Sequence, residues 1–294
     1  MQTEYKGLVI KGIGGFYYVE TDSGVFECKA KGKFRNKKIS PVAGDRVTVT
    51  IRGSQENTID SIDERKNKMT RPPVANIDKL LIAVSVAKPF PNTLIIDKMT
   101  VLAEKNNIKP FIVITKTDLK QSDELFEIYK SAGYNVYRFS KDDHSELPLI
   151  KNELKGCLTA FTGNSGVGKS TLINALNDAL ELETGEISDK LGRGRHTTRQ
   201  AEIHHVAGGL VIDTAGFSSV EFVNDDILLS EDIQYYFNEF DEYIGQCRFI
   251  GCSHTGDRGC KIREAVDNGV ISKSRYESYL SMYNEMKDIK KWQL

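Results

Sequence analysis

A glycine-rich segment lies just past the middle of the 294-residue chain: Gly163-Asn164-Ser165-Gly166-Val167-Gly168-Lys169-Ser170-Thr171. It matches the phosphate-loop pattern G-x-x-x-x-G-K-[ST] at every fixed position. The apolar run 158–162 before it predicts a buried strand, and residues 170–180 after it predict a helix. Backbone N–H groups of such a loop, together with the helix dipole, attract phosphates. We therefore expect a nucleotide site in which Lys169 reaches the terminal phosphates and Ser170 binds Mg²⁺.

A second motif, Thr115-Lys116-Thr117-Asp118, follows the apolar run 111–115. It resembles the guanine-reading sequence N-K-x-D of GTPases. Asp118 would accept hydrogen bonds from guanine N1–H and the 2-amino group, and adenine has no donors there. Lys116 would lay its aliphatic stem along the base. Thr115 replaces the usual Asn and removes an amide that usually ties this loop to the phosphate loop, a change that bears on base affinity and not on base identity.

Two further segments are candidates for the switches that sense the γ-phosphate. The polar stretch 192–199 holds Thr197 and Thr198, one of which would bind Mg²⁺, with Thr198 as our candidate. Asp213-Thr214-Ala215-Gly216 matches D-x-x-G after an apolar strand. Asp213 would join the Mg²⁺ shell, and the Gly216 N–H would bind the γ-phosphate.

The position after D-x-x-G holds Phe217, where many small GTPases have a Gln that orients the attacking water. Because Phe217 can neither donate nor accept a hydrogen bond, we expect slow unaided hydrolysis. His196 is our candidate catalytic residue, since an imidazole titrates near neutral pH and can orient or deprotonate water. The alternatives are a solvent-exposed loop histidine and a catalytic group supplied from outside the chain.

The order of these motifs is unusual, because T-K-T-D precedes the phosphate loop. Apolar strands alternate with helices from residue 79 onward, which predicts an α/β domain with a parallel sheet. A parallel sheet keeps its contacts when its termini are joined and the chain is opened elsewhere. We therefore predict a circularly permuted P-loop GTPase domain over residues 71–222.

Residues 1–70 predict five short strands in a small barrel, an OB-fold domain, with an SH3-like barrel as the alternative. Residues 1–72 carry 14 Lys or Arg against 9 Asp or Glu. Six of those cations crowd into residues 29–38, together with Phe34. We expect this run to contact RNA, with Phe34 stacking on a base, and a solvated loop is the alternative. Residues 65–76 read as a basic, proline-stiffened linker.

The C-terminal region 223–294 predicts a mostly helical domain that contains the pattern C-x4-C-x-H-x5-C. Its potential ligands are Cys247, Cys252, His254 and Cys260. Three thiolates and one imidazole complete a tetrahedral Zn²⁺ shell, so the site would be structural, and buried free cysteines are the alternative. Cys28 and Cys157 are expected to be packing residues. Apolar residues at helical spacing from 276 to 289 predict a docked last helix.

Composition bounds the remaining possibilities. The net charge is −1, five cysteines argue against a disulfide framework, and no apolar run is long enough to cross a membrane. We expect a multidomain, monomeric, cytoplasmic protein.

The whole pattern of barrel, permuted GTPase motifs and zinc spacing resembles the bacterial small ribosomal subunit biogenesis GTPase family, RsgA. The resemblance implies a GTPase that acts late in maturation of the 30S subunit, binds 16S rRNA, is stimulated by the 30S particle and converts GTP to GDP. A nucleotide-gated RNA-binding switch with incidental hydrolysis is the alternative. An ATPase is a third possibility, against which Asp118 argues.

Overall fold

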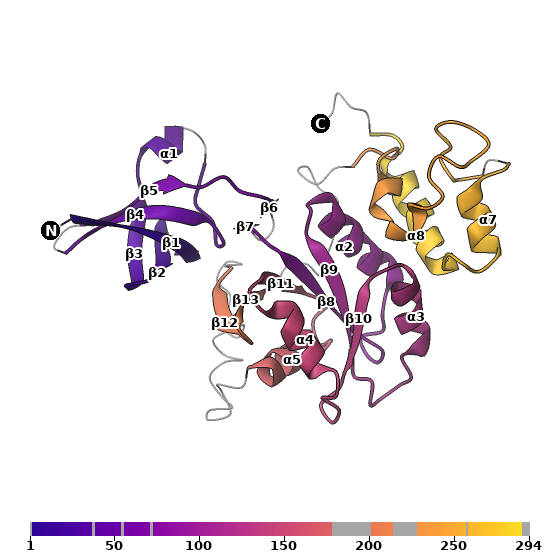
Figure 1. Ribbon diagram of the computed structural model, residues 1–294, viewed down its shortest axis with the longest axis horizontal. Helices are drawn as coiled ribbons and strands as arrows, with labels where there is room; N and C mark the ends of the chain where they lie inside the picture. The colour runs from indigo at the N-terminus through magenta and orange to yellow at the C-terminus, as the bar shows by residue number, and fades with distance from the viewer. Residues whose placement is uncertain are drawn as a thin grey trace. The chain divides into compact units, whose positions relative to one another are not determined.

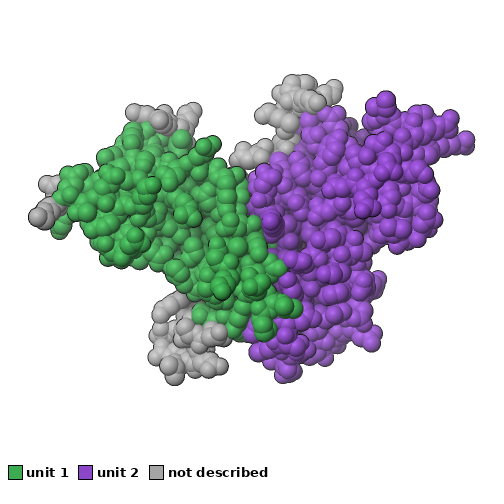
Figure 2. Space-filling model, in the orientation of Figure 1, with its two compact units in different colours: residues 1–80, 148–162, 170–217 green, residues 81–147, 163–169, 218–294 purple. Residues whose placement is uncertain are grey.

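A computed structural model describes residues 2–36, 39–53, 56–70, 73–177, 201–213, 228–256 and 258–289 (Figure 1). The chain divides into two compact units, residues 1–80, 148–162 and 170–217 in the first, and 81–147, 163–169 and 218–294 in the second (Figure 2). The first unit holds the N-terminal barrel. The second holds the base-reading motif, most of the phosphate loop and the C-terminal helices.

Five N-terminal strands form a closed barrel in the order β1-β2-β3-β5-β4. They are β1 (Gln2–Ile13), β2 (Phe16–Thr21), β3 (Gly24–Ala30), β4 (Arg46–Arg52) and β5 (Asn57–Ile62). Neighbouring strands are antiparallel except β3 and β5, which run parallel with Cys28 opposite Asn57. A five-stranded barrel with this order is of the OB type, as the sequence predicted. Burial raises the pKa of the Cys28 thiol to about 11, which suits a packing residue.

The basic segment after β3 differs from the expectation in one respect. It contains the short helix α1 (Lys33–Asn36), and the Phe34 ring is buried in the barrel core beside Val9 and Val47. The prediction that Phe34 stacks on a base is therefore wrong. The ring lies inside the barrel, where its apolar surface is removed from water, and it is not available to a base. Lys31 pairs with Asp60 at 2.7 Å, so part of the positive charge is already neutralised.

The segment that follows the barrel is not a simple linker. It forms a two-stranded antiparallel sheet of β6 (Lys68–Thr70) and β7 (Pro73–Ala75). Arg65 donates to both carboxylate oxygens of the fully buried Asp45, at 2.6 and 2.7 Å. This bidentate pair fixes the segment to the barrel, a long-range contact that the local composition does not reveal.

The central sheet has six strands in the order β10-β9-β8-β11-β13-β12. They are β8 (Lys79–Ser85), β9 (Lys109–Thr115), β10 (Asn135–Phe139), β11 (Leu158–Thr162), β12 (Ile203–Val206) and β13 (Gly209–Asp213). β10 runs parallel to β9 and β11 parallel to β13, whereas β12 pairs antiparallel with β13 as a hairpin. β9 ends at Thr115, β11 leads into the phosphate loop and β13 ends at Asp213, so each motif begins at the carboxyl end of a strand. Ligands of open α/β sheets bind at that edge.

Helices connect the strands as the alternating pattern predicted. They are α2 (Thr93–Lys105), α3 (Asp123–Ser131), α4 (Leu147–Leu154) and α5 (Lys169–Leu176). The Asn92 side chain caps α2 by accepting the Ile95 N–H at 3.3 Å. The sequence analysis did not anticipate α4, whose eight residues carry a proline in the first turn, where proline is tolerated.

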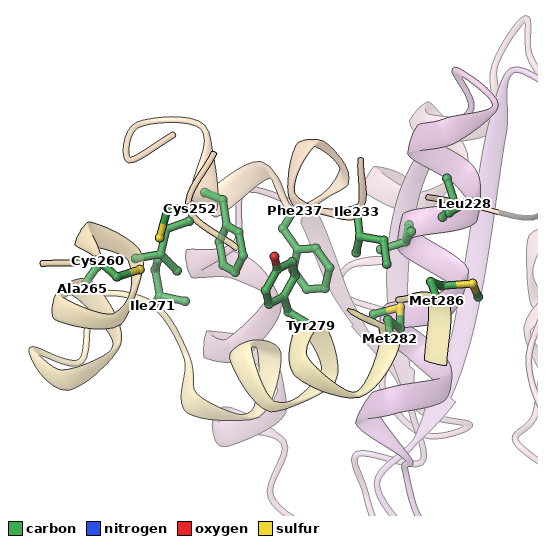
Figure 3. Packing of buried hydrophobic residues seen from close by; sticks show 13 residues of the cluster. Leu228, Ile233, Phe237, Cys252, Cys260, Ala265, Ile271, Tyr279, Met282 and Met286 are labelled. Carbon is green, nitrogen blue, oxygen red and sulfur yellow. The ribbon is translucent and has the colours of Figure 1, made fainter. Parts of the chain in front are cut away.

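The C-terminal region is a small helical assembly around one apolar cluster (Figure 3). Its elements are the 3₁₀ helices η2 (Ile233–Tyr236) and η3 (Asn238–Phe240) and the α-helices α7 (Lys261–Asp267) and α8 (Lys273–Met286). Tyr279 and Met282 of α8 are buried in this cluster together with Val101 of α2. The predicted docking of an amphipathic last helix is confirmed. Among the described residues, no helix is long and apolar enough to cross a membrane.

A buried charge network joins α8 to α2, and the sequence analysis did not anticipate it. The Arg275 side chain is fully buried and donates to Asp97 Oδ1 and to Glu239 Oε1, each at 2.7 Å. The Tyr129 hydroxyl donates to the same Asp97 oxygen at 2.9 Å. Because buried charges require partners, this arrangement fixes the orientation of α8 against α2.

Candidate nucleotide and metal sites

The phosphate loop lies between β11 and α5, as the motif predicted. Gly163 has a φ of 141°, and a Cβ on it would lie 2.3 Å from the Ala83 carbonyl oxygen. Only glycine fits that position without moving the backbone. Lys169 begins α5, and its ammonium donates to the Gly163 carbonyl oxygen at 2.5 Å. The ammonium therefore lies against the loop, where it can exchange this carbonyl for a phosphate oxygen.

Thr115 connects the base-reading motif to the phosphate loop. Its side chain is buried at the end of β9, and its hydroxyl donates to the Val167 carbonyl oxygen, with the Val84 carbonyl oxygen 3.2 Å away. The expectation that replacing Asn by Thr removes this connection is wrong. A hydroxyl is shorter than an amide, but the phosphate-loop backbone at Val167 lies within its reach.

The other residues of this motif form a turn. The Leu119 N–H donates to the Lys116 carbonyl oxygen at 2.9 Å, and Lys116 has a φ of 60°. The Lys116 ammonium donates to the Lys88 carbonyl oxygen, which anchors the end of this side chain. The Asp118 carboxylate is exposed, as an acceptor for a base must be. Thr117 is half-buried at the variable position.

Several predicted residues lie outside the described part of the chain. They are His196, Thr197, Thr198, Gly216 and Phe217. The backbone of Asp213 ends β13, and its side chain is likewise outside the described residues.

The Thr115 connection gives a direct prediction. Thr115→Val keeps the shape of the side chain but removes the hydroxyl, leaving the buried Val167 carbonyl without this donor. A neutral hydrogen bond contributes about 0.5–1.5 kcal/mol, so GDP affinity should fall about two- to tenfold in isothermal titration. Thr117→Val in the same loop is the matched control and should change affinity little. Equal affinities for the Thr115 variant and the control would show that the connection does not support the site.

The four predicted metal ligands converge in the C-terminal region. The ligand atoms of Cys247, Cys252, His254 and Cys260 all lie within 4.8 Å of one another, and three of these residues are buried. His254 Nδ1 lies 3.6 Å from Cys247 Sγ and 3.4 Å from Cys260 Sγ, and the two sulfurs are 4.0 Å apart. Tetrahedral Zn²⁺ separates neighbouring sulfur and nitrogen ligands by about 3.5–3.8 Å. The donor set and its spacing therefore fit a four-coordinate metal ion.

Two tyrosines of α8 donate hydrogen bonds to the backbone of the metal loop, the segment 247–260 that carries the four ligands. The Tyr276 hydroxyl donates to the His254 carbonyl oxygen at 2.6 Å, and Tyr279 donates to the Ser253 carbonyl oxygen at 2.8 Å. In Figure 3, Cys252 and Cys260 lie at one end of the apolar cluster, whose centre holds Tyr279 and Phe237. The sequence analysis treated these tyrosines as packing residues alone. Their hydroxyls also donate to part-buried carbonyl oxygens of the loop.

Two segments of the chain match known families, and the whole chain is similar to named proteins. Residues 6–59 match the RsgA N-terminal domain, and residues 62–223 match the RsgA GTPase. A protein of Halalkalibacterium halodurans named small ribosomal subunit biogenesis GTPase RsgA is 40% identical over 288 residues, which cover 96% of this chain and 97% of that protein.

The chain belongs to the RsgA family.

Two solved structures of similar proteins support the same assignment. YloQ, described as a circularly permuted GTPase, is 35% identical with a TM-score of 0.79, covering 98% of this chain and 96% of that one. YjeQ from Thermotoga maritima is also 35% identical, with a TM-score of 0.81 and coverage of 98% and 100%. The predicted circular permutation and the assignment as a GTP hydrolase of the RsgA family are confirmed.

Proposed function

We propose that this GTPase acts on the small ribosomal subunit late in its maturation, in the cytoplasm and as a monomer. Guanine recognition by Asp118 and phosphate binding by residues 163–171 would form one site, supported by the hydroxyl of Thr115 that joins the two segments. The relative from H. halodurans carries small-subunit biogenesis in its name. Three domains, residues 1–70, 71–222 and 223–294, would bind RNA, hydrolyse GTP and hold zinc.

The divalent ions have separate tasks in this proposal. Mg²⁺ would bind with GTP through the Ser170 hydroxyl, Asp213 and Thr198, and it would neutralise charge on the phosphates. Zn²⁺ would be held by the three cysteines and His254. Because that site supplies four protein ligands and leaves no open position, its zinc would stabilise the C-terminal region and take no part in hydrolysis.

Binding to purified 30S subunits tests the proposed partner. We expect the protein to sediment with 30S subunits in the presence of a non-hydrolysable GTP analogue and to be released with GDP. Equal sedimentation in both nucleotides would contradict a nucleotide-controlled partner. Absence of sedimentation in either would contradict the partner itself.

The basic segment 29–38 should make this binding depend on salt. Replacing Lys31, Lys33, Arg35 and Lys37 by Ala should flatten the dependence of log affinity on log salt, by about 0.7–0.9 for each phosphate that the segment no longer neutralises. Lys33→Ala should have a larger effect than Lys31→Ala, because Lys33 is exposed and the Lys31 ammonium is already paired with Asp60. An unchanged slope would show that the segment is only solvated.

His196 is the proposed water-orienting residue for hydrolysis on the ribosome. Binding to 30S subunits would bring its imidazole to the γ-phosphate and supply what Phe217 cannot. His196→Ala should therefore lower stimulated turnover by about 10²–10⁴-fold while GTP and 30S affinities hold. Hydrolysis is measured as phosphate release with and without 30S subunits. Retained stimulation would place the catalytic group on the ribosome or elsewhere in the chain.

A further inference from the structure

Gln234 lies directly behind the metal cluster, and the family motifs do not include it. Its Oε1 is 2.8 Å from Nε2 of His254, the ring nitrogen opposite the one that faces the cysteines. We propose that Gln234 is a positioning residue for the metal: it holds His254 in the one tautomer and ring orientation that can bind zinc. The inference rests on the zinc site proposed above.

The orientation of the Gln234 amide follows from its second contact. The amide nitrogen donates to the Glu231 carbonyl oxygen at 2.8 Å, so the amide oxygen must point toward His254. Turning the amide over would lose this hydrogen bond and place the amide oxygen against the Glu231 carbonyl oxygen. The amide oxygen can only accept, and therefore His254 Nε2 carries the hydrogen.

This assignment leaves the other ring nitrogen able to bind metal. A neutral imidazole has one N–H, so Nδ1 of His254 presents a lone pair. That atom is the one within 3.6 Å of both Cys247 Sγ and Cys260 Sγ. Had Nδ1 carried the hydrogen, the ring would donate to a thiolate and could not coordinate the ion. The hydrogen bond from Nε2 thus selects the form of the ring that the metal requires.

The element that carries Gln234 is itself held in place. Ile233, which precedes Gln234 in η2, is fully buried in the apolar cluster. Phe237, which follows η2, is buried in the same cluster (Figure 3). Tyr276 fixes the backbone of His254 from the opposite element, α8. With both backbones fixed, the Gln234 contact orients the ring before the metal arrives. Removing such a partner of a metal-bound histidine typically lowers metal affinity about 10- to 100-fold.

Zinc affinity of the full-length protein tests the proposal. Gln234→Leu removes the acceptor, and Gln234→Asn keeps an amide that is one methylene too short to reach the ring. Gln234→Glu keeps an acceptor at the same reach and loses only the donor to the Glu231 carbonyl oxygen. Competition with a chromophoric chelator should show zinc affinity about 10- to 100-fold lower for the Leu and Asn variants, and wild-type or tighter affinity for the Glu variant. The control is Gln121→Leu, an exposed glutamine outside this region, which should bind zinc like the wild type.

Each outcome decides the proposal. The absorption spectrum of the cobalt-substituted proteins should shift in the Leu and Asn variants, because a misoriented imidazole alters the ligand field. Wild-type zinc affinity in both variants would overturn the role of Gln234 while leaving the metal site intact. A decrease in the Glu variant as large as in the Leu variant would show that an acceptor for the histidine ring does not set zinc affinity, and would overturn the proposal. Failure of the wild type to bind zinc would overturn the metal site itself. The difference in zinc affinity between the Asn and Glu variants tests the role of Gln234 even when the Leu variant does not fold.

Discussion

Asp118→Asn should change the base preference of this GTPase from guanine to xanthine. The wild-type carboxylate would accept two hydrogen bonds from guanine, and hydrogen bonds to a charged group contribute about 1.5–3 kcal/mol each. Loss of both corresponds to a fall in GTP affinity of about 10²–10⁴-fold. The new amide can donate to the 2-oxo group of xanthine, so xanthosine triphosphate should bind more tightly to the variant than to the wild type.

A neighbouring carboxylate supplies the control for this experiment. Asp123 is the first residue of α3, five residues after Asp118, and its exposed carboxylate pairs with Arg138 at 2.8 Å. Asp123→Asn removes the same charge from the protein and should leave GTP affinity within about twofold, as exposed ion pairs contribute little. Competition titrations with both nucleotides measure the exchange. Wild-type GTP affinity in Asp118→Asn would remove the base-reading role from this motif.

Arg275→Met should strongly destabilise the C-terminal region. The guanidinium is fully buried between Asp97 and Glu239, and its removal takes away the positive charge that pairs with both buried carboxylates. Breaking a buried pair from one side costs about 3–5 kcal/mol. We expect the free energy of unfolding in urea to fall by that amount, whereas Lys273→Met, at an exposed position on the same helix, should change it by less than about 0.5 kcal/mol.

The pH dependence of this variant has a defined sign. Burial raises the pKa of Asp97 even with Arg275 present, so the folded state binds a proton there more readily than the unfolded state does. A carboxyl pKa that is higher in the folded state than in the unfolded state lowers the free energy of unfolding at pH values above that pKa. The lost stability is regained as the pH falls. The loss of stability in Arg275→Met should therefore be smaller at about pH 5 than at about pH 8. A loss that is equal at both values, or greater at the acidic one, would contradict the assignment of the loss to unpaired carboxylates.

The parts of this protein that the sequence predicted well are those in which chemistry requires adjacent residues. The phosphate loop needs its glycines and lysine within one short loop, and the metal site needs its four ligands within fourteen residues. The buried strands also show as continuous apolar runs, because a parallel sheet is covered on both faces. Order of motifs along the chain was sufficient to recognise the circular permutation.

The parts that the sequence did not predict depend on contacts between distant residues. Thr115 and Val167 are far apart in the chain, and only the close approach of β9 to the phosphate loop shows that a hydroxyl is long enough to connect them. Phe34 stands in a run of lysines, yet its ring completes the barrel core. Arg275 stands just before an apolar helical stripe, and nothing local indicates that it pairs with two acids on other elements.

Gln234 belongs to the same class of omissions. It lies 20 residues before His254 in the short 3₁₀ helix η2, and no recognisable motif includes it. A rule that every metal-bound histidine needs an acceptor for its second N–H would have shown that some such residue exists. The sequence offers several polar candidates for that role, and only the folded geometry distinguishes among them.

Phosphate release from GTP, measured with and without purified 30S subunits under otherwise identical conditions, tests the proposed function most directly. Slow hydrolysis by the isolated protein is expected because Phe217 cannot orient water. Addition of 30S subunits should raise the turnover number by about 10²-fold or more, the contribution of a positioned general base. If the protein binds 30S subunits and its turnover number stays at the unaided value, the chain is a nucleotide-gated RNA-binding switch and not a ribosome-stimulated enzyme.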